Sequence, residues 1–541
     1  MNNAIYNFNA PANEPIFEYL KGSKERNALF EELNRQLSGT VEVPCIIGGK
    51  EYYTGNTSNI IQPHNHQHKL GVYHNVTEKQ LELAVKSALD AHRIWSDLSW
   101  TVRASILLKA AELISGKYRY LLSAATMLGQ SKNIYQSEID SVCETIDFLK
   151  YNSFFASKIY EMQPASTFNQ LNKMEFRPLE GFVFTVSPFN FTAIASNLNM
   201  APVLMGNTTI WKPASTSVLS NYILMKIFME AGMPDGVINF VPGKGSTIGR
   251  RVLSDPMLAG IHFTGSNHTF NSLWRQVTET LPKYRSYPRM VGETGGKDFI
   301  FVHPSADPLE VAVGAVRGAF EYQGQKCSAA SRMYVPQSLW PSVKSLMVDM
   351  CHDMKMGDVT DSDNFMNAVI DEASFDNIIN YIEYAKNSSE AQIICGGNGN
   401  KSTGFFVDAT IIETTNPYFK TMEEEIFGPV LTVWVYPDQK LTEAVDICDK
   451  TSPYGLTGAV FSRDRVAASA ICEKLRYAAG NFYINDKPTG AIVGLQPFGG
   501  SRASGTNDKA GGEFNLIRWI SPRTIKETFR PATEYKYGYM N

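Results

Sequence analysis

Apolar residues recur at helical spacing along the first part of the chain. In residues 77–96 and 101–114 they stand three and four positions apart, which predicts two amphipathic helices. Thr77 and Gln80 have the spacing of a capping box, in which each side chain bonds to the other residue's backbone. Residues 137–160 predict another long helix. We therefore expect the chain to begin with a helical segment.

The pattern changes after residue 180, where short β-rich runs end in turn residues. These runs and the helical stretches between them cover residues 181–188, 208–213, 217–231, 236–243, 246–254 and 260–266. A second alternating region starts near residue 295 and contains helices over 309–322 and 373–386 and a strand over 332–336. Alternation of this kind predicts an α/β protein with two doubly wound, parallel sheets, whose ligands bind at the carboxyl ends of the strands.

Two segments, residues 159–180 and 506–541, have an extended pattern outside the α/β body. Exposed strand edges pair with other chains, so we expect a small β extension that forms a homodimer or a higher homo-oligomer. The rest of the chain divides into a first unit of residues 1–158 and 181–292 and a second unit of residues 293–505.

Composition argues against several classes of function. The 541 residues carry a net charge of −4 and no block of like charges, which argues against nucleic-acid binding. No apolar stretch approaches the length of about 18 residues that a membrane span needs. The seven cysteines are scattered without a CxxC pair, as expected for free thiols in a reducing compartment. We expect a cytoplasmic protein, or a mitochondrial matrix protein if the chain is a processed eukaryotic form.

Four histidines lie close together in "PHNHQHKLGVYH", namely His64, His66, His68 and His74. The first three are two positions apart, so they could share one side of a strand and hold a metal ion. No carboxylate or cysteine accompanies them, and we expect an ordinary surface strand and no metal.

Four separate segments supply the groups that a thiol enzyme acting on a carbonyl needs. They are "SPFNF" with Asn190, "WKPAS" with Lys212, "GETGGKD" with Glu293 and "EYQGQKCSAASR" with Cys327. An Asn amide can donate to a developing oxyanion, a cysteine thiolate is a strong nucleophile, and a carboxylate can act as general base. Each residue alone has an ordinary structural explanation, such as a packed thiol, a turn former or a solvated charge.

The order of these motifs is more specific than any one of them. "PFNF", "WKPA", "FTGS", "ETGGK", "GQKCSA", "EEIFGPV" and "PFGGSRASGTN" follow one another, and over residues 10–530 the chain resembles the aldehyde dehydrogenase superfamily. The resemblance implies a dinucleotide-binding domain in the first unit and a catalytic domain in the second. It also implies that Cys327 is the nucleophile, that Asn190 forms the oxyanion hole, and that Glu293 is the general base that hydrolyses the thioester.

The same resemblance implies a dinucleotide site. Its residues would be Ser187, Lys212, Gly265, Ser266, Glu425 and Phe427. Lys212 would contact the adenosine ribose, and Glu425 the hydroxyls of the nicotinamide ribose. Where NAD-preferring relatives often carry an acid, this chain has Ser215, so we expect NAD and leave NADP open.

Within the superfamily the phrases "NEPIFEYLKGSKER", "IVGLQPFGGSRASGTNDKAGG" and "IRWISPRTIKE" resemble the branch that oxidises L-glutamate-γ-semialdehyde to L-glutamate, the second step of proline degradation. That resemblance implies six substrate contacts, at Glu144, Phe191, Ser328, Gly490, Ala491 and Phe498. Ser328 and an anchor loop, residues 489–494, would bind the carboxylate, although Ala491 replaces a serine that some members carry. Glu144 would bind the ammonium, and the two phenylalanines would enclose the aliphatic chain.

Three alternatives remain open at this point. The substrate could be another semialdehyde or an aliphatic aldehyde. A CoA-acylating dehydrogenase would share the cysteine, but it does not require a hydrolytic base such as Glu293. A catalytically silent scaffold protein is a third alternative, which the joint presence of Asn190, Glu293 and Cys327 argues against.

Overall fold

A computed structural model describes residues 8–540. The first sheet has seven strands, in the order β11 (Arg289–Glu293), β10 (Leu258–Thr264), β7 (Phe182–Val186), β8 (Thr208–Lys212), β9 (Ile238–Phe240), β2 (Cys45–Ile47) and β3 (Lys50–Tyr52). The strands from β11 to β9 are parallel, and β2 pairs antiparallel with β9 and β3. This sheet is therefore parallel with an antiparallel edge.

Side chains from both faces of this sheet are buried. Phe182 and Phe184 of β7 belong to one apolar core, and Val183 belongs to another on the opposite face. Besides α5 and α6, which are described below, the helices of this unit include α1 (Lys24–Leu37), α2 (Glu78–Asp97), α3 (Trp100–Ser115), α4 (Arg119–Gln130), α7 (Thr192–Leu204), α8 (Val218–Ala231), α9 (Gly245–Leu253) and α10 (Asn267–Thr280). The predicted capping box is confirmed, since the Thr77 N–H donates to Gln80 Oε1 at 3.0 Å.

The second sheet also has seven strands, in the order β14 (Ala391–Cys395), β17 (Thr410–Thr414), β18 (Val430–Tyr436), β13 (Ala330–Pro336), β12 (Asp298–Val302), β20 (Thr457–Phe461) and β21 (Asn481–Ile484). The edge strand β14 is antiparallel to its neighbour, and the other pairs are parallel. The helices of this unit are α11 (Pro308–Phe320), α12 (Trp340–Asp353), α13 (Glu372–Lys386), α14 (Lys420–Glu423), α15 (Leu441–Lys450) and α16 (Arg465–Lys474). The α/β class with two wound sheets is confirmed. We propose the domain boundary at residues 292–293, at the carboxyl end of β11, one residue before the chain leaves this strand towards β12.

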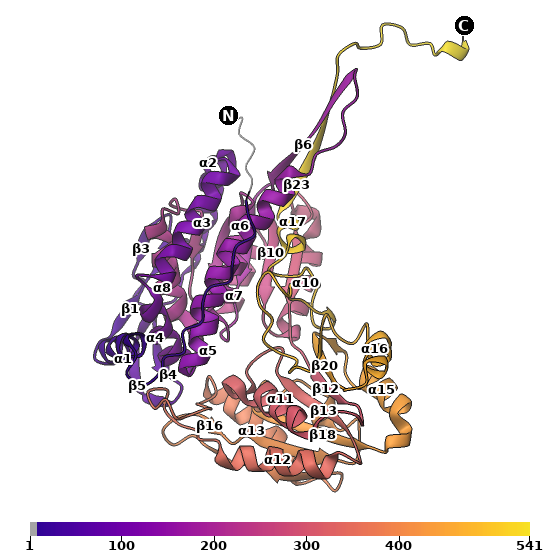
Figure 1. The fold of residues 1–541 in the computed structure, drawn as a ribbon. Helices are drawn as coiled ribbons and strands as arrows, with labels where there is room; N and C mark the ends of the chain where they lie inside the picture. Colours follow the sequence, from indigo (N-terminus) through magenta and orange to yellow (C-terminus); the bar gives the residue numbers. More distant parts are fainter. Residues whose placement is uncertain (1–7, 541) are drawn as a thin grey trace.

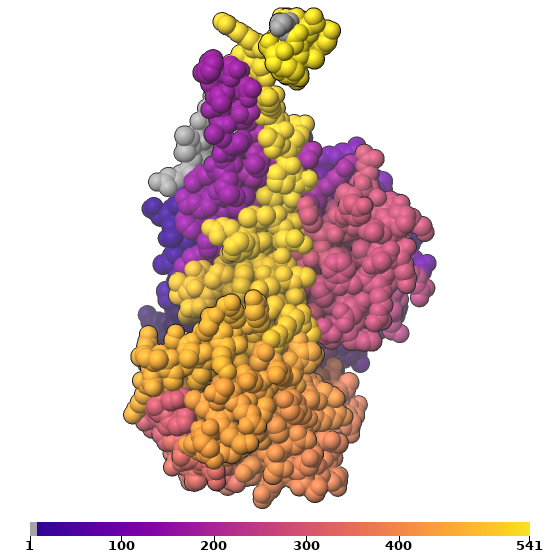
Figure 2. Space-filling model, turned by 90° about the vertical axis from the view of Figure 1, so that its right-hand side faces the viewer, coloured from indigo at the N-terminus to yellow at the C-terminus, as the bar shows by residue number. Residues whose placement is uncertain are grey.

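A two-stranded ribbon projects from the body (Figure 1). It pairs β6 (Gln170–Pro178) antiparallel with β23 (Ile520–Thr528). Figure 2 shows the C-terminal segment, in yellow, passing from this ribbon along the body towards the second domain. A smaller sheet near the N-terminus joins β1 (Val41–Val43), β5 (Asn65–His74) and β4 (Thr57–Gln62). Within residues 8–540, no helix is long and apolar enough to cross a membrane.

The expected helix over 137–160 is interrupted. A short helix, α5 (Ile134–Ser137), leads into a π-helical segment, Glu138–Glu144, before α6 (Thr145–Glu161) begins. The π segment carries two buried carboxylates, Glu138 and Asp140, which are paired with Arg119 and Lys132 respectively. Such insertions are common at functional sites, and this one ends at Glu144.

Candidate active site

Cys327 lies on a turn between a short helical segment, Glu321–Gly324, and β13. Tyr322 and Gln323 have positive φ values of 50° and 55°, which are costly for residues with a side chain. Both side chains are fastened to the first domain: the Tyr322 hydroxyl donates to Gln130 O at 3.0 Å, and Gln323 Nε2 donates to Ser131 O at 3.0 Å. Gln323 Nε2 also donates to Ala368 O of its own domain at 2.8 Å, so the strained turn that presents the thiol is held from both domains.

Asn190 follows β7, at the carboxyl edge of the first sheet, and is buried. Its Nδ2 donates to Gln325 O at 3.1 Å, two positions before Cys327. The structure thus brings the amide to the turn that carries the thiol, where it can donate to an oxygen that forms there.

Glu293 is the last residue of β11. Its Oε2 accepts a hydrogen bond from the Gly500 N–H at 3.3 Å, and burial raises its pKa well above the ordinary value. Burial also raises the pKa of the Cys327 thiol, and the nearby charges of Asp298, Glu293 and Glu425 add to that rise. The carboxyl group and the thiol are therefore close enough to influence each other, both are half-buried, and the raised pKa favours the protonated thiol.

Lys509 supports the segment that holds Glu293. Its Nζ donates to Gly499 O at 2.9 Å and to Gly480 O at 2.8 Å. Gly499 precedes the amide that binds Glu293, and a Cβ at Gly499 would lie 2.9 Å from Glu293 Oε1. Sequence reasoning placed "GTNDKAGG" among the resembling phrases but missed this support, because nothing local links the lysine to the carboxyl group.

The residues expected to bind a dinucleotide lie along the ends of β8 and β10 and on the facing domain. Lys212 ends β8, burial lowers its pKa to about 8, and within residues 8–540 its ammonium has no hydrogen-bond or ion-pair partner. Ser187 is buried and accepts a hydrogen bond from Trp211 Nε1 at 3.0 Å. Gly265 donates its N–H to Glu293 O at 3.2 Å, and the exposed Ser266 caps α10.

Glu425 and Phe427 approach from the second domain. Glu425 Oε1 accepts a hydrogen bond from the Gly296 N–H at 2.9 Å, and burial raises its pKa to about 7. Phe427 has a φ of 58°, and its ring meets the edge of the Phe189 ring at 5.8 Å between centroids. Ser215, in contrast, is exposed at the start of a short turn.

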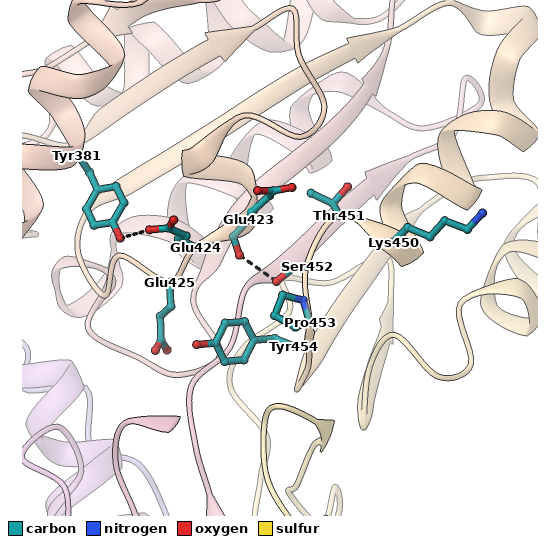
Figure 3. Close-up of a pocket in the computed structure, with 9 residues that line it drawn as sticks. All are labelled: Tyr381, Glu423, Glu424, Glu425, Lys450, Thr451, Ser452, Pro453 and Tyr454. Atoms are coloured by element: carbon teal, nitrogen blue, oxygen red, sulfur yellow. Dashed lines mark hydrogen bonds between the residues drawn. The ribbon is translucent and has the colours of Figure 1, made fainter. Parts of the chain in front are cut away.

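A cavity of about 680 Å³ opens beside Glu425 (Figure 3). Its lining residues are Tyr381, Glu423, Glu424, Glu425, Lys450, Thr451, Ser452, Pro453 and Tyr454. Of the expected site residues only Glu425 lines it, so this cavity adjoins the expected dinucleotide side and does not contain Cys327.

Ser328 meets the anchor loop directly. Its Oγ lies 2.8 Å from Thr489 Oγ1, and both side chains are buried. Gly490 has a φ of 99°, a conformation that favours glycine, and Ala491 is half-buried beside it. Thr489 lies in the loop that the sequence indicated, but only the structure identifies its hydroxyl as the partner of Ser328.

A buried ion network connects the Cys327 turn to the same loop. Lys326, next to Cys327, pairs with Glu321 at 3.1 Å, and Lys487 lies 3.5 Å from the same carboxylate. Lys487 Nζ also donates to Thr489 O at 3.3 Å. Sequence reasoning missed these residues because lysines and glutamates are usually solvated.

Glu144 ends the π-helical segment and is half-buried. Burial, followed by the charge of Asp140, raises its pKa to about 8. The neighbouring Lys132 and Asp140 form a buried pair at 2.6 Å, and Lys132 Nζ lies 4.4 Å from the centroid of the Phe191 ring. Phe191 is thereby placed beside the acidic segment that carries Glu144.

Phe498 is held in a backbone bridge with Ala510, with hydrogen bonds of 2.9 and 2.8 Å. In the part of the chain that the structure describes, no ring contact joins Phe191 and Phe498. Both rings are half-buried, so an enclosure of the aliphatic chain between them stays a prediction.

His64, His66 and His74 have separate partners and do not converge on one point. His64 is buried against Ser131 Oγ at 3.2 Å, His66 Nε2 contacts Lys401 O at 2.9 Å, and His74 Nε2 contacts Glu42 Oε1 at 2.8 Å. No set of three His, Cys, Asp or Glu side chains in residues 8–540 has the geometry of a metal site.

Comparison with known proteins identifies the family of this chain. The model of the Aldehyde dehydrogenase family matches residues 52–525. "Delta-1-pyrroline-5-carboxylate dehydrogenase, mitochondrial" of Dictyostelium discoideum is 50% identical over 537 residues, 99% of this chain and 96% of that protein. The human protein of the same name is 47% identical over 531 residues, 98% of this chain and 94% of that protein.

Solved structures give the same result for the fold. The Delta-pyrroline-5-carboxylate dehydrogenase of Mycobacterium tuberculosis, bound with NAD, superposes with a TM-score of 0.96 at 46% identity and 100% coverage of both chains. The 1-pyrroline-5-carboxylate dehydrogenase from Thermus with bound NAD gives a TM-score of 0.90 at 32% identity, covering 97% of this chain and 100% of that one. This chain belongs to the aldehyde dehydrogenase family.

Proposed function

We propose that this protein is an NAD-dependent dehydrogenase that oxidises L-glutamate-γ-semialdehyde, the hydrolysed form of Δ1-pyrroline-5-carboxylate, to L-glutamate. The observation that carries the proposal is that the turn with Cys327 brings together the groups for aldehyde oxidation and the groups for binding a carboxylate. Asn190, Glu293 and Cys327 supply the chemistry of aldehyde oxidation, and the Ser328–Thr489 contact joins the thiol to a loop suited to a carboxylate. Relatives named for this reaction cover nearly the whole chain.

The residues present fit a bound dinucleotide. The ammonium of Lys212, which has no partner among the described residues, can bind ribose hydroxyls. Glu425 can accept hydrogen bonds from a second ribose, and the N–H groups at the start of α10 favour a pyrophosphate. When bound, NAD supplies the acceptor for a hydride. The exposed Ser215 neither chelates a ribose diol nor repels a 2′-phosphate, and the Mycobacterium tuberculosis structure is bound with NAD.

The chain's own groups account for the remaining chemistry. The Cys327 thiol gives its proton to water, and the thiolate bonds to the aldehyde carbon while the C=O π electrons move to the oxygen, which gives the thiohemiacetal oxyanion. In the structure the Asn190 amide donates a hydrogen bond to the Gln325 carbonyl, and from this position it can stabilise the oxyanion. After oxidation the thioester on Cys327 is hydrolysed by water, from which Glu293 takes a proton, a role that its raised pKa suits.

At the other end of the substrate, Ser328, Thr489 and the backbone N–H groups of Gly490 and Ala491 bind the carboxylate. The missing hydroxyl at Ala491 is compensated by Thr489, whose Oγ1 already faces Ser328. Glu144 binds the ammonium, and a nearby cation would lower the pKa that burial has raised, so that the carboxylate ionises as the substrate binds.

Steady-state kinetics with Δ1-pyrroline-5-carboxylate test this function. We expect a higher kcat/KM with NAD than with NADP, and a higher kcat/KM for the semialdehyde than for hexanal. Preference for hexanal would support the alternative of an aliphatic aldehyde dehydrogenase. Stimulation of turnover by CoA would support an acylating enzyme, and no NADH with any aldehyde would support a silent scaffold.

The ribbon of β6 and β23 supports a homo-oligomer, at least a dimer. Its tip exposes apolar side chains, since Phe168 is 96% exposed and Phe529 is 56% exposed. Exposed apolar surface of this kind is typical of a contact between subunits. The eukaryotic relatives are named mitochondrial, and we place this protein in the mitochondrial matrix if it is a processed eukaryotic form, or otherwise in the cytoplasm.

A further inference from the structure

The segment before the first helix, residues 11–19, is an extended strap that lies along the first domain. Figure 1 shows it as a dark trace that runs beside α6. It lies outside residues 52–525, the part that matches the family model. Its polar groups nevertheless contact two parts of the proposed substrate site, namely the helical region that follows Glu144 and the anchor loop, residues 489–494.

The strap is fixed to the π-helical segment by a buried ion network. Arg119 pairs with Glu138 and, at 3.0 Å, with Glu14 of the strap. Glu138 also accepts hydrogen bonds from the Phe17 N–H at 3.1 Å and from the Tyr19 hydroxyl at 2.7 Å. Among the described residues Arg119 is the only cation paired with the buried Glu138, so its loss would leave that carboxylate without a charge partner. The network therefore fixes the strap to the π-helical segment.

Asn13 links two parts of the proposed site through one amide group. Its Nδ2 donates to Asp147 Oδ2 at 2.7 Å and to Val493 O at 2.9 Å, and its Oδ1 accepts from the Tyr151 hydroxyl at 3.2 Å. Asp147 follows Glu144 by three positions, and Val493 lies in the anchor loop. The strap therefore joins the segment that carries the proposed ammonium contact to the loop that carries the proposed carboxylate contact.

Apolar packing reinforces this link. Val493 belongs to a small core cluster with Phe148, Tyr151 and Ala193. Gly494 lies against the Tyr151 ring, and a Cβ at that position would be 2.2 Å from it. The anchor loop thus rests on α6, and Asn13 fixes the loop to the same helix.

We propose that the N-terminal strap is a specificity-determining part of the substrate site, with Asn13 as its positioning residue. The ammonium and the carboxylate of an α-amino acid are attached to one carbon, so their binding groups must keep a fixed separation. Asn13 maintains that separation, whereas a simple aldehyde that lacks both groups does not depend on it. This proposal rests on the proposed function, because Glu144 and the anchor loop bind the ammonium and the carboxylate only if the substrate is the semialdehyde of an amino acid.

The test compares Asn13→Ala and Asn13→Asp with wild type and with Glu18→Ala, an exposed strap residue, as matched control. For Asn13→Ala we expect KM for the semialdehyde to rise about tenfold, the effect of losing one or two hydrogen bonds. Both kcat and the kcat/KM for propanal should stay within about twofold of wild type. Asn13→Asp should raise KM at least as much, because a second carboxylate would face Asp147.

A second measurement separates this proposal from the proposed function. Hydrogen exchange of a peptide covering residues 487–497 should be faster in Asn13→Ala than in wild type and unchanged in Glu18→Ala, without any substrate. Unchanged exchange and unchanged KM would overturn the role of the strap, and so would an equal loss of activity with propanal and the semialdehyde. If wild type itself did not prefer the semialdehyde, the function would be wrong, while faster exchange would still support the positioning of the loop by Asn13.

Discussion

Ser328 Oγ and Thr489 Oγ1 lie 2.8 Å apart, although 161 positions separate them in the sequence. This contact joins the residue after Cys327 to the first residue of the anchor loop. The reacting end and the recognition end of the proposed substrate are thus held by adjacent groups.

Replacement of Thr489 by valine should weaken recognition without removing the chemistry. Valine has nearly the shape of threonine but cannot hydrogen-bond to Ser328 or to a carboxylate. We expect KM for the semialdehyde to rise about fivefold to tenfold with little change in kcat, measured by NADH formation. Thr489→Ser is the control that retains the hydroxyl, and a valine variant with wild-type KM would remove Thr489 from the substrate site.

Cys327→Ala should abolish turnover, because no other group of the proposed site can form the thioester. We expect a loss of at least about 10⁴-fold in kcat, with NAD affinity retained within about threefold when binding is followed by protein fluorescence. Cys472, a half-buried free thiol on α16, offers Cys472→Ala as a matched control, which should keep full activity. Continued NADH formation by Cys327→Ala would refute its assignment as nucleophile.

Glu293→Gln should slow hydrolysis of the thioester more than its formation. A burst of NADH followed by a steady state slowed about 100-fold is expected in rapid mixing. Since burial raises the pKa of Glu293, the base is formed only as the pH rises through that pKa. The wild-type steady-state rate should therefore increase with pH, and this limb should be absent from the Gln variant. A variant with neither a burst nor a change in pH profile would show that another group activates the water.

Glu144 should make the fold less stable as the pH rises. Its pKa is about 8 in the folded protein and 4.5 when unperturbed. Between these values the folded state binds more protons than the unfolded state, so stability decreases with increasing pH. The melting temperatures of Glu144→Gln and wild type should diverge as the pH rises from 4.5 to about 8. Over that range the variant should gain roughly 2 °C in melting temperature relative to wild type. A constant difference across that range would contradict the raised pKa.

The ribbon of β6 and β23 should govern assembly. Light scattering should give wild type a mass of at least a dimer. Phe168→Asp combined with Phe529→Asp places two charges on the apolar tip and should increase the monomer fraction several-fold at micromolar concentration. Tyr287→Asp, on the exposed surface of the first domain, is the control. A monomeric wild type would exclude the proposed oligomer.

Sequence alone was sufficient where local chemistry decides the structure. Helical periodicity located α2 and α3 close to their observed ends, and the Thr77–Gln80 pair marked a cap that the structure confirms. The alternation of β-rich runs and helices also predicted both wound sheets.

The rest depended on contacts between distant parts of the chain. The π-helical segment at Glu138–Glu144 buries carboxylates against Arg119 and Lys132, which helical spacing does not encode. Asn13 and Val493 are 480 positions apart, so no local pattern could join the strap to the anchor loop. Residue types indicated the reacting groups, whereas their supports became visible only in three dimensions.

The strained turn at Tyr322 and Gln323 makes the position of the thiol dependent on the contact between domains. The Tyr322 hydroxyl and Gln323 Nε2 donate to the carbonyls of Gln130 and Ser131 at the end of α4, so separation of the domains would remove both contacts. Gln323 Nε2 would keep its hydrogen bond of 2.8 Å to Ala368 O in its own domain, whereas the Tyr322 side chain would be released. The unfavourable backbone conformation at Tyr322 would then relax, and the thiol would shift from its place near Asn190. The enzyme's activity should therefore depend on the contact between the two domains. In mild denaturant, activity would disappear before either sheet unfolds.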